Sequence, residues 1–330
     1  MTWLTWRQAR AQLLVASVAL AALAVYLVSL GGSIRRFYDE RIAGCEGQAC
    51  YLARWDLRAG FDDGVSVAMV LLLAVPGLIG VFWGAPLVAQ ELEQRTERLV
   101  WNQSITRRRW LAVKLLVVGL CGAAMSGLFS LLLTWSVSRY DQVVGGRFAA
   151  LGFASRNLVP IGYALFAFVL GSVIGMVLRR TLPAMAVTLV VFAAVQLLVP
   201  TAVRQHLVPA VTTTVAVDAA VLNSGVGMRL NEDDTFDLQG YVAEGSWSLD
   251  FSAPLSKADG SSYTGEDAKP CLLPEDMAAG DACVVAQDLH FEYTHQPADR
   301  YWTFQWIELS MFVGLALVLA GFGFLWIRRL

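Results

Sequence analysis

The chain has 330 residues, of which 56% are hydrophobic and 16% are charged, and its mean hydropathy is +0.54. A soluble domain is about half apolar and roughly a quarter charged, so this composition excludes an ordinary soluble protein. The net charge of -2 argues against a strongly basic nucleic-acid-binding protein, and we expect no nucleic acid among its partners.

The few lysines and histidines limit the chemistry that the chain can carry. No lysine follows a glycine, so the G-x-x-x-x-G-K-[ST] loop that binds ATP phosphates is absent. We therefore expect no enzyme activity and no cofactor bound by this chain. Its 3 histidines leave little room for a haem or a histidine-rich metal centre, so we predict no metal site and no catalytic residue.

Six stretches are long and apolar enough to cross a bilayer, which takes about 20 apolar residues in a helix. None of them contains Asp, Glu, Lys, Arg or His. The first is longer than the apolar part of a cleaved signal peptide, so we interpret it as a retained helix. The six predicted spans are Ala11–Leu30, Val65–Ala89, Leu115–Val137, Leu158–Leu178, Leu182–Val203 and Leu309–Ile327.

The distribution of basic residues predicts the orientation of these spans. With the N-terminus inside, 12 of the 25 Lys and Arg residues fall on short cytoplasmic segments, where basic residues accumulate. The others lie on longer external loops, which carry less weight, although loop 32–64 with its arginines favours the opposite orientation. We therefore expect a multi-pass protein of the cell membrane with both termini in the cytoplasm.

Four of the 5 cysteines fall in two pairs on the predicted outside. Cys45 and Cys50 share the first loop, and Cys271 and Cys283 share the last. Disulfides persist outside the cytoplasm, and the spacing supplies no further metal ligands, so we favour two disulfides over free thiols or a metal site. Cys121 lies alone in the third span, where we expect a small buried hydrophobic side chain.

The segment between spans five and six is too long to be a simple connection. Between residues 231 and 300, 15 acidic residues stand against three basic ones, which indicates an acidic, solvated surface. We therefore predict an all-α polytopic membrane protein with six transmembrane helices and a small mixed α/β external domain. Residues 1–10 form an amphipathic leading segment, 11–203 hold spans one to five, 204–302 form the external domain, and 303–330 hold the sixth span and a cytoplasmic tail.

Within the external domain, two segments alternate apolar and polar side chains, which is typical of half-buried strands. These are 247–251 and 289–293. Val211–Leu222 is too short to span a membrane and is either a strand or a helix on the surface. The stretch 252–282 is rich in Gly, Pro, Ser and Asp and is expected to be loop.

The spans lack the ionisable side chains that ion-coupled transporters and intramembrane proteases need at depth, and Glu308 lies just before the sixth span. The expected pathway is apolar and suits an amphipathic or lipid-like cargo, with energy supplied by a partner. Pro76-Gly77 predicts a kink within span two. The G-x-x-x-G patterns Gly80–Gly84 and Gly171–Gly175 permit close helix packing, and we favour contacts within the chain over a dimer interface.

The stretch between spans two and three is the most informative part of the sequence. Apolar residues recur at helical spacing from Leu92 to Val100, with charged residues on the other side. Asn102-Gln103-Ser104 breaks this helix, and Thr106 is placed to cap the next one. Composition alone favours a surface helix beside a basic membrane anchor. The other interpretation is a coupling element that docks into a nucleotide-binding partner.

This stretch resembles the loop of type-2 ABC exporter permeases, in which a Glu-rich end of the second span leads into a Thr-containing helix. In that family Ser/Thr, Arg and Lys then open the third span. Thr2–Arg10 is similar to the start of actinobacterial members, and Arg300–Glu308 is similar to their last span. Arg95 stands where members often have glycine. The residues that match the loop pattern are Glu91, Glu93, Thr96, Leu99, Ser104, Arg107 and Lys114.

The resemblance implies the membrane-spanning subunit of an ABC exporter with a span order like that of the G-type exporters. Such a subunit works in the bilayer as a homodimer or heterodimer with two ABC ATPase chains, which bind the ATP and Mg²⁺. The resemblance implies that loop 90–110 contacts the ATPase through Glu91, Glu93, Arg95, Thr96, Leu99 and Trp101. From the family's use of spans two and five, it places the substrate pathway at Met69, Leu73, Phe192 and Gln196.

A function of another class stays open on the sequence alone. The chain could be a membrane-anchored sensor or assembly protein whose external domain binds a ligand or a partner. Such a protein would need no ATPase subunit, so co-purification separates the two hypotheses.

Overall fold

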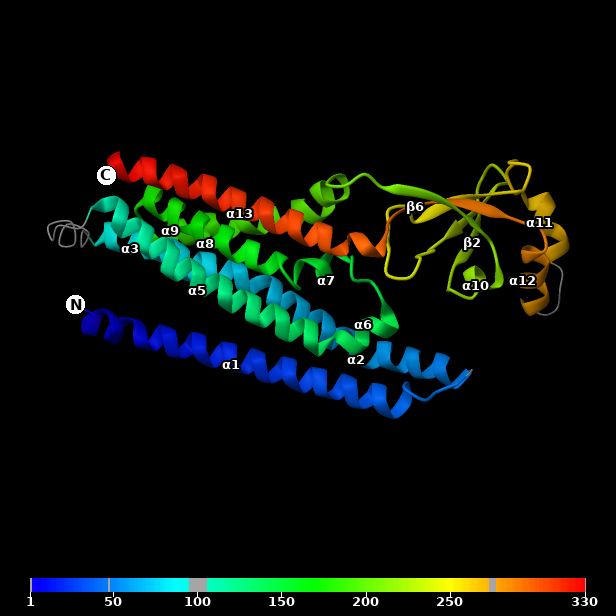
Figure 1. Cartoon of the computed structure of the whole chain (residues 1–330), viewed down its shortest axis with the longest axis horizontal. Helices are drawn as coiled ribbons and strands as arrows, with labels where there is room; N and C mark the ends of the chain where they lie inside the picture. Colours follow the sequence, from blue (N-terminus) through cyan, green and yellow to red (C-terminus); the bar gives the residue numbers. More distant parts are fainter. Residues whose placement is uncertain (1, 47, 95–105, 273–276, 330) are drawn as a thin grey trace. The chain divides into compact units, whose positions relative to one another are not determined.

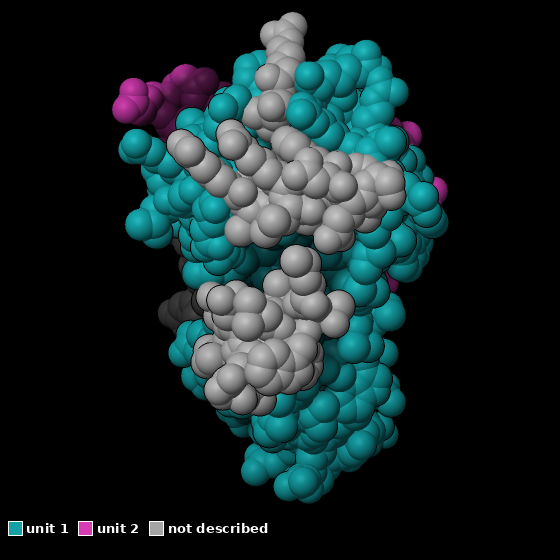
Figure 2. Space-filling view, turned by 90° about the vertical axis from the view of Figure 1, so that its left-hand side faces the viewer, with its two compact units in different colours: residues 1–145, 149–204, 302–330 teal, residues 146–148, 205–301 magenta. Residues whose placement is uncertain are grey.

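The computed structural model describes the backbone of residues 2–46, 48–94, 106–272 and 277–329, and the side chains of 18–46, 49–94, 106–271 and 279–328. The chain divides into two compact units, which Figures 1 and 2 show. Unit 1, teal in Figure 2, comprises Met1–Gly145, Ala149–Arg204 and Trp302–Leu330. Unit 2 comprises Gly146–Phe148 and Gln205–Tyr301.

Within the described residues, 6 helices are long and apolar enough to cross a membrane, as predicted. The start of α1, the end of α3 and the end of α13 all lie on the same side of unit 1 (Figure 1). The helices therefore cross unit 1 an even number of times. The helices are α1 (Thr2–Arg41); α2 (Gln48–Leu78), continued by the π-helical η1 (Ile79–Gly84) and by α3 (Ala85–Glu93); α5 (Arg107–Ser136); α8 (Val159–Leu178); α9 (Thr181–Leu198), continued by the π-helical η2 (Val199–Val203) and the 3₁₀ turn η3 (Arg204–His206); and α13 (Tyr301–Trp326), which ends in the 3₁₀ turn η5 (Ile327–Arg329). The short helices α6 (Ser138–Val144) and α7 (Ala150–Ala154) lie between α5 and α8.

The prediction that residues 32–64 form a loop is wrong, because most of this segment is helical. Helix α1 continues to Arg41 and α2 begins at Gln48, so only a short turn separates them. The segment contains no proline, and charged residues do not prevent a helix that leaves the apolar part of its span. At the other end, residues 2–10 form the first turns of α1. Their side chains lie outside the described residues, so the amphipathic character of 1–10 stays a prediction.

Contacts with the end of α5 and with α6 hold this helical extension in place. The Arg35 guanidinium donates to the Trp135 carbonyl at 2.6 Å and stacks over its ring, 3.7 Å from the ring centre. The Tyr140 hydroxyl of α6 donates to Asp62 Oδ1 of α2 at 2.6 Å. Burial, followed by this hydrogen bond, raises the pKa of Tyr140 above its ordinary value.

Glycines bring η1 and α3 into backbone contact with α8. A Cβ on Gly84 would lie 2.5 Å from the Phe168 carbonyl oxygen, and one on Gly175 would lie 2.5 Å from that of Ala85. Gly80 and Gly171 face each other in the same seam. The two G-x-x-x-G patterns therefore pack on each other within the chain, as predicted. The π-helical turn that begins shortly after Pro76 belongs to this close approach.

Unit 2 is built on an antiparallel sheet whose strands follow the order β1-β6-β5-β3-β2, with β4 paired to β6. Its core includes Phe291 and Tyr293 of β6, Leu255 of β5 and Leu238 of β3, together with residues of the surrounding helices. The strands are β1 (Val211–Ala216), β2 (Gly227–Leu230), β3 (Phe236–Gln239), β4 (Trp247–Ser248), β5 (Ser252–Ser256) and β6 (His290–Gln296). The helices are α10 (Ala219–Leu222), α11 (Gly265–Leu272), α12 (Met277–Val285) and the 3₁₀ turn η4 (Ala298–Arg300).

The sequence predictions for this unit hold in part. The predicted strand at 289–293 is β6, the strand at 247–251 shortens to β4, and Val211–Leu222 supplies both β1 and α10. The expectation of loop for 252–282 is wrong, because this stretch holds β5, α11 and part of α12. Ala253 and Leu255 are buried and Pro254 between them is exposed. This stretch therefore alternates like a strand, although its composition is typical of a loop.

Candidate functional site

Glu91 and Lys114 join the end of α3 to the start of α5 at the base of loop 90–110. Lys114 Nζ lies 2.5 Å from Glu91 Oε1 and donates to the Leu87 carbonyl at 3.1 Å. The ammonium group also stands 4.3 Å from the centre of the Trp110 ring. Both charged side chains are partly exposed, so this ion pair adds little to stability. It links the two helices on either side of the loop.

Glu93, the last residue of α3, caps the start of α9. Its Oε2 accepts hydrogen bonds from the Thr181 backbone N–H at 2.9 Å and from the Thr181 hydroxyl at 2.8 Å. A carboxylate at a helix N-terminus satisfies free backbone donors and faces the positive end of the helix dipole. The two acidic residues predicted at this loop therefore connect α3 to two different spans, α5 and α9.

The other coupling candidates, Arg95, Thr96, Leu99 and Trp101, lie outside the described residues. Thr106 is the first described residue after this stretch. Its side-chain oxygen accepts from the Arg109 backbone N–H at 3.4 Å and caps α5 as predicted. Figure 2 views unit 1 from this end of the helices. The structure therefore defines both ends of the loop through Glu91, Glu93 and Thr106.

Three of the four pathway candidates come together where α2 packs on α9. Gln196 Nε2 donates to the Leu73 carbonyl at 2.8 Å. The Phe192 ring is buried against Gly77 and meets the ring of Tyr163 edge to face, with centroids 6.0 Å apart. A Cβ on Gly77 would lie 3.0 Å from the Phe192 ring, so the absence of a side chain at Gly77 lets the ring pack this closely.

Met69, the fourth pathway candidate, contacts a buried ion pair instead. Its sulfur lies 3.8 Å from Arg156 Nη2, and Arg156 Nη1 lies 2.5 Å from Asp141 Oδ2. The Arg156 and Asp141 side chains are only 6% and 10% exposed, so the guanidinium is shielded from solvent by protein. The residues around Met69 are therefore more polar than the predicted apolar pathway.

Arg204 and Glu308 form a second buried ion pair, at the end of the fifth span and near the start of the sixth. Their side chains are 1% and 0% exposed, and Arg204 Nε lies 2.5 Å from Glu308 Oε1. Close by, the side-chain oxygen Oε1 of Gln305 accepts from the backbone N–H groups of Leu158 and Val159 at the start of α8. Ionisable groups buried in a membrane domain are costly and mark functional positions.

Sequence reasoning missed Thr181 and these buried pairs. Arg204 and Glu308 stand 104 residues apart, and each borders an apolar run, where a single charge is ordinarily read as facing water. The sequence contained one signal for the Arg204–Glu308 pair: a basic residue follows the fifth span and an acidic residue precedes the sixth. Thr181 carries no such signal, because its partner is 88 residues away.

The cysteine pairs lie at disulfide-bonding distance, with Cys45 beside Cys50 and Cys271 beside Cys283. The first pair links the ends of α1 and α2, and the second links α11 to α12. Cys121 is free and exposed on α5. The expectation that it is buried is therefore wrong, because its side of α5 faces away from the other helices.

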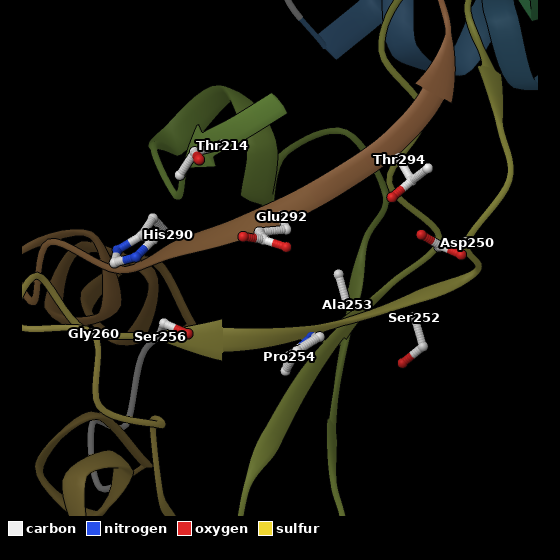
Figure 3. A pocket seen from close by; sticks show the side chains of 10 residues that line it. All are labelled: Thr214, Asp250, Ser252, Ala253, Pro254, Ser256, Gly260, His290, Glu292 and Thr294. Atoms are coloured by element: carbon white, nitrogen blue, oxygen red, sulfur yellow. The ribbon is translucent and has the colours of Figure 1, made fainter. Parts of the chain in front are cut away.

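Unit 2 carries a polar hollow of about 410 Å³ on the exposed side of its sheet, which Figure 3 shows. Residues at alternate strand positions line it, on the opposite side from the buried Phe291 and Tyr293. Within the described residues, no group of three or more His, Cys, Asp or Glu side chains could hold a metal ion. The lining residues are Thr214, Asp250, Ser252, Ala253, Pro254, Ser256, Gly260, His290, Glu292 and Thr294.

Comparison with protein families gives a match over more than half of the chain. The family described as ABC-2 membrane transporter related matches residues 17–204, which run from α1 through α9 to η3. No curated protein and no solved structure matches the chain. Members of this family are the membrane-spanning subunits of transporters, and they work with an ABC ATPase subunit. The chain therefore belongs to the ABC-2 membrane transporter related family and is a multi-pass membrane transport subunit.

Proposed function

We propose that this chain is the permease subunit of an ATP-driven exporter of an amphipathic or hydrophobic substrate. The observation that carries the proposal is the family match across residues 17–204, which includes the loop between α3 and α5. The direction of transport follows from the resemblance of loop 90–110 to those of type-2 ABC exporters.

The proposed complex contains two copies of an ABC ATPase and two permease chains, as a homodimer or as a heterodimer with a related permease. ATP and Mg²⁺ bind to the ATPase subunits, and this chain binds neither. The permease dimer lies in the cell membrane with both chain ends in the cytoplasm. The start of α1 and the end of α13 lie on the same side of unit 1 as the end of α3, which supports this orientation.

Loop 90–110 is the proposed contact with the ATPase. The bonds of Glu91 to Lys114 and of Glu93 to Thr181 support this role, because they connect the base of the loop to α5 and α9. Movement of the loop on ATP binding then reaches the membrane spans. Arg95, Thr96, Leu99 and Trp101 are the residues proposed to touch the ATPase itself.

The proposed substrate path follows α2 and α9, past Met69, Leu73, Phe192 and Gln196. The apolar character of both helices supports an amphipathic or hydrophobic substrate, and residues 204–302 are proposed as an external domain above its exit. Gln196 already bonds to the Leu73 carbonyl, so a polar group of the substrate would have to replace this bond.

A pull-down from native membranes tests the proposal, followed by ATPase stimulation with a panel of amphipathic compounds. A stoichiometric ABC ATPase that hydrolyses ATP faster with some compounds is the expected result. Replacing Glu91 or Arg95 is expected to uncouple hydrolysis from transport while the chain still binds its ATPase. Unchanged transport in both variants would count against the coupling role.

The same pull-down addresses the sensor hypothesis. A sensor would bind its ligand in unit 2, where the polar hollow beside Glu292 is available, and would carry no ATPase. Isolation of the chain without any nucleotide-binding subunit would favour this alternative.

A further inference from the structure

The first turn of α9 depends on a side chain from another span. Arg180, at the N-cap position, makes no capping hydrogen bond with its own side chain. The cap comes from Glu93 of α3, whose carboxylate accepts from both the backbone N–H and the hydroxyl of Thr181. Two hydrogen bonds to one carboxylate oxygen therefore connect the end of the second span to the beginning of the fifth.

Small residues continue this contact along α3 and α9. Ala85 and Ala89 of α3 and Ala184 of α9 are fully buried against one another. The buried centre of this contact consists of methyl groups, with Ile174 and Met185 packed at its edge, so the two helix backbones approach closely there. A shift at the end of α3 is therefore passed on to the first turn of α9.

The connection from α3 to α5 is different in kind. It runs through the Lys114 side chain, which has four rotatable bonds and bonds to both Glu91 and the Leu87 carbonyl. A flexible side chain with a second acceptor can follow Glu91 without moving its helix. The connection through Glu93 differs in ending on a backbone N–H and on a short side chain at the first residue of α9.

Helix α9 is less enclosed by the other helices of the chain than α8 is. In its most apolar stretch, 22% of the residues are buried, against 72% in α8. It carries Phe192 and Gln196, so a displacement of its first turn reaches the part of the helix that contacts Leu73 and Gly77.

We propose that Thr181 is a positioning residue for transport, through which the end of α3 moves the fifth span directly by way of Glu93. This inference rests on the proposed function. It adds a defined route, in which α9 receives the displacement without the third and fourth spans as intermediates.

The test uses the full chain with its ATPase in lipid nanodiscs and proteoliposomes. Thr181→Val removes the hydroxyl and keeps the shape of the side chain, and Thr181→Ser restores the hydroxyl. Thr188→Val is the matched control, because the Thr188 hydroxyl donates only within α9, to the Ala184 carbonyl at 2.7 Å. Spin labels on the exposed Val190 and Val318, in a Cys121→Ser background, report the distance between α9 and α13 with and without ATP.

In Thr181→Val we expect transport per ATP hydrolysed to fall by about threefold, since the exposed hydroxyl bond to Glu93 is lost while the backbone N–H bond stays. The ATP-dependent change in label distance is expected to disappear, while Thr181→Ser and Thr188→Val keep both properties. A merely structural role of Thr181 would lower thermal stability without removing the ATP-dependent change.

Wild-type coupling and a wild-type distance change in Thr181→Val would overturn the inference and leave the proposed function intact. If the wild-type complex itself showed no ATP-dependent transport, both would fail. Should Thr181→Val assemble poorly, Glu93→Ala answers the same question, because it removes the acceptor of both Thr181 hydrogen bonds. Full coupling in Glu93→Ala would also overturn the inference.

Discussion

Arg204 and Glu308 form an ion pair that protein shields almost completely from solvent, with 1% and 0% of the two side chains exposed. The guanidinium also lies over the Phe153 ring, 4.2 Å from its centre. The pair therefore joins the end of the fifth span to both α7 and α13. A buried charge pair costs desolvation energy, which only its mutual attraction and further contacts offset.

Removing one partner of this pair should destabilise the protein strongly. We expect Glu308→Ala to cost about 3–5 kcal/mol, since it leaves Arg204 buried without its counter-charge. The double variant Arg204→Met with Glu308→Leu should recover most of that loss, because no charge stays buried. Thermal unfolding in detergent measures both, and Lys257→Met, in a partly exposed pair with Asp267, is the control with a smaller effect. Equal losses in the single and double variants would contradict this account.

The close packing of η1 and α3 on α8 predicts that a glycine-to-alanine substitution has opposite effects at two positions, Gly84 and Gly314. Gly84→Ala should lower stability by roughly 1–3 kcal/mol, since the added Cβ would lie 2.5 Å from the Phe168 carbonyl oxygen. Gly314→Ala in α13 meets no heavy atom within 4 Å and should be neutral or stabilising, because alanine favours a helix. Unfolding midpoints of the two variants check the prediction. Equal midpoints would mean that the seam adapts to a methyl group.

The stability of unit 2 should depend on pH through Asp267. Hydrogen bonds from the Thr264 hydroxyl and backbone N–H, together with Lys257, hold the pKa of Asp267 below its ordinary value. Its ionised form is thus favoured by folding, and this contribution is complete above the unfolded pKa of about 3.9 and lost as pH falls through the lower folded value.

We therefore expect the unfolding midpoint of the wild type to fall more steeply between about pH 5 and pH 3 than that of Asp267→Asn. The exposed Asp281→Asn serves as the matched control and should keep the wild-type profile. Parallel profiles for the wild type and Asp267→Asn would show that the Thr264 bonds do not contribute to acid stability.

Thiol counting tests the cysteine pairs and the exposure of Cys121. Without reductant, a maleimide should label one thiol per chain after denaturation, and mass spectrometry should locate it at Cys121. In the native membrane, a charged, impermeant reagent should label poorly, since α5 presents this residue within an apolar span. Reduction of the denatured chain should raise the number of labelled thiols to 5. More than one free thiol before reduction would contradict the pairing of Cys45 with Cys50 or of Cys271 with Cys283.

The sequence predicts the spans and misses their mutual contacts for a physical reason. A membrane span is a local property of about 20 consecutive residues, so all six could be read directly. The contact of Glu93 with Thr181 depends on how helices pack, and nothing in the residues near Thr181 indicates a partner 88 positions away. The same holds for Arg204 and Glu308, each of which looks like an ordinary charge at the edge of a span.

Composition misled the interpretation in two places. Loop 32–64 is polar and yet helical, because Arg35 and Asp62 find partners on α5 and α6. Residues 252–282 are rich in turn formers, yet Leu255 and Tyr263 enter the core of unit 2. The G-x-x-x-G patterns were interpreted correctly, because small residues at that spacing have few other uses within an apolar helix.

The backbone seam between the second span and α8 has a consequence for inhibitors. Where even a methyl group does not fit beside Gly84 and Gly175, no lipid tail or drug can wedge the two helices apart. Compounds that enter from the bilayer have more exposed surface to contact along α1, α9 and α13, whose apolar stretches are mostly uncovered in the single chain.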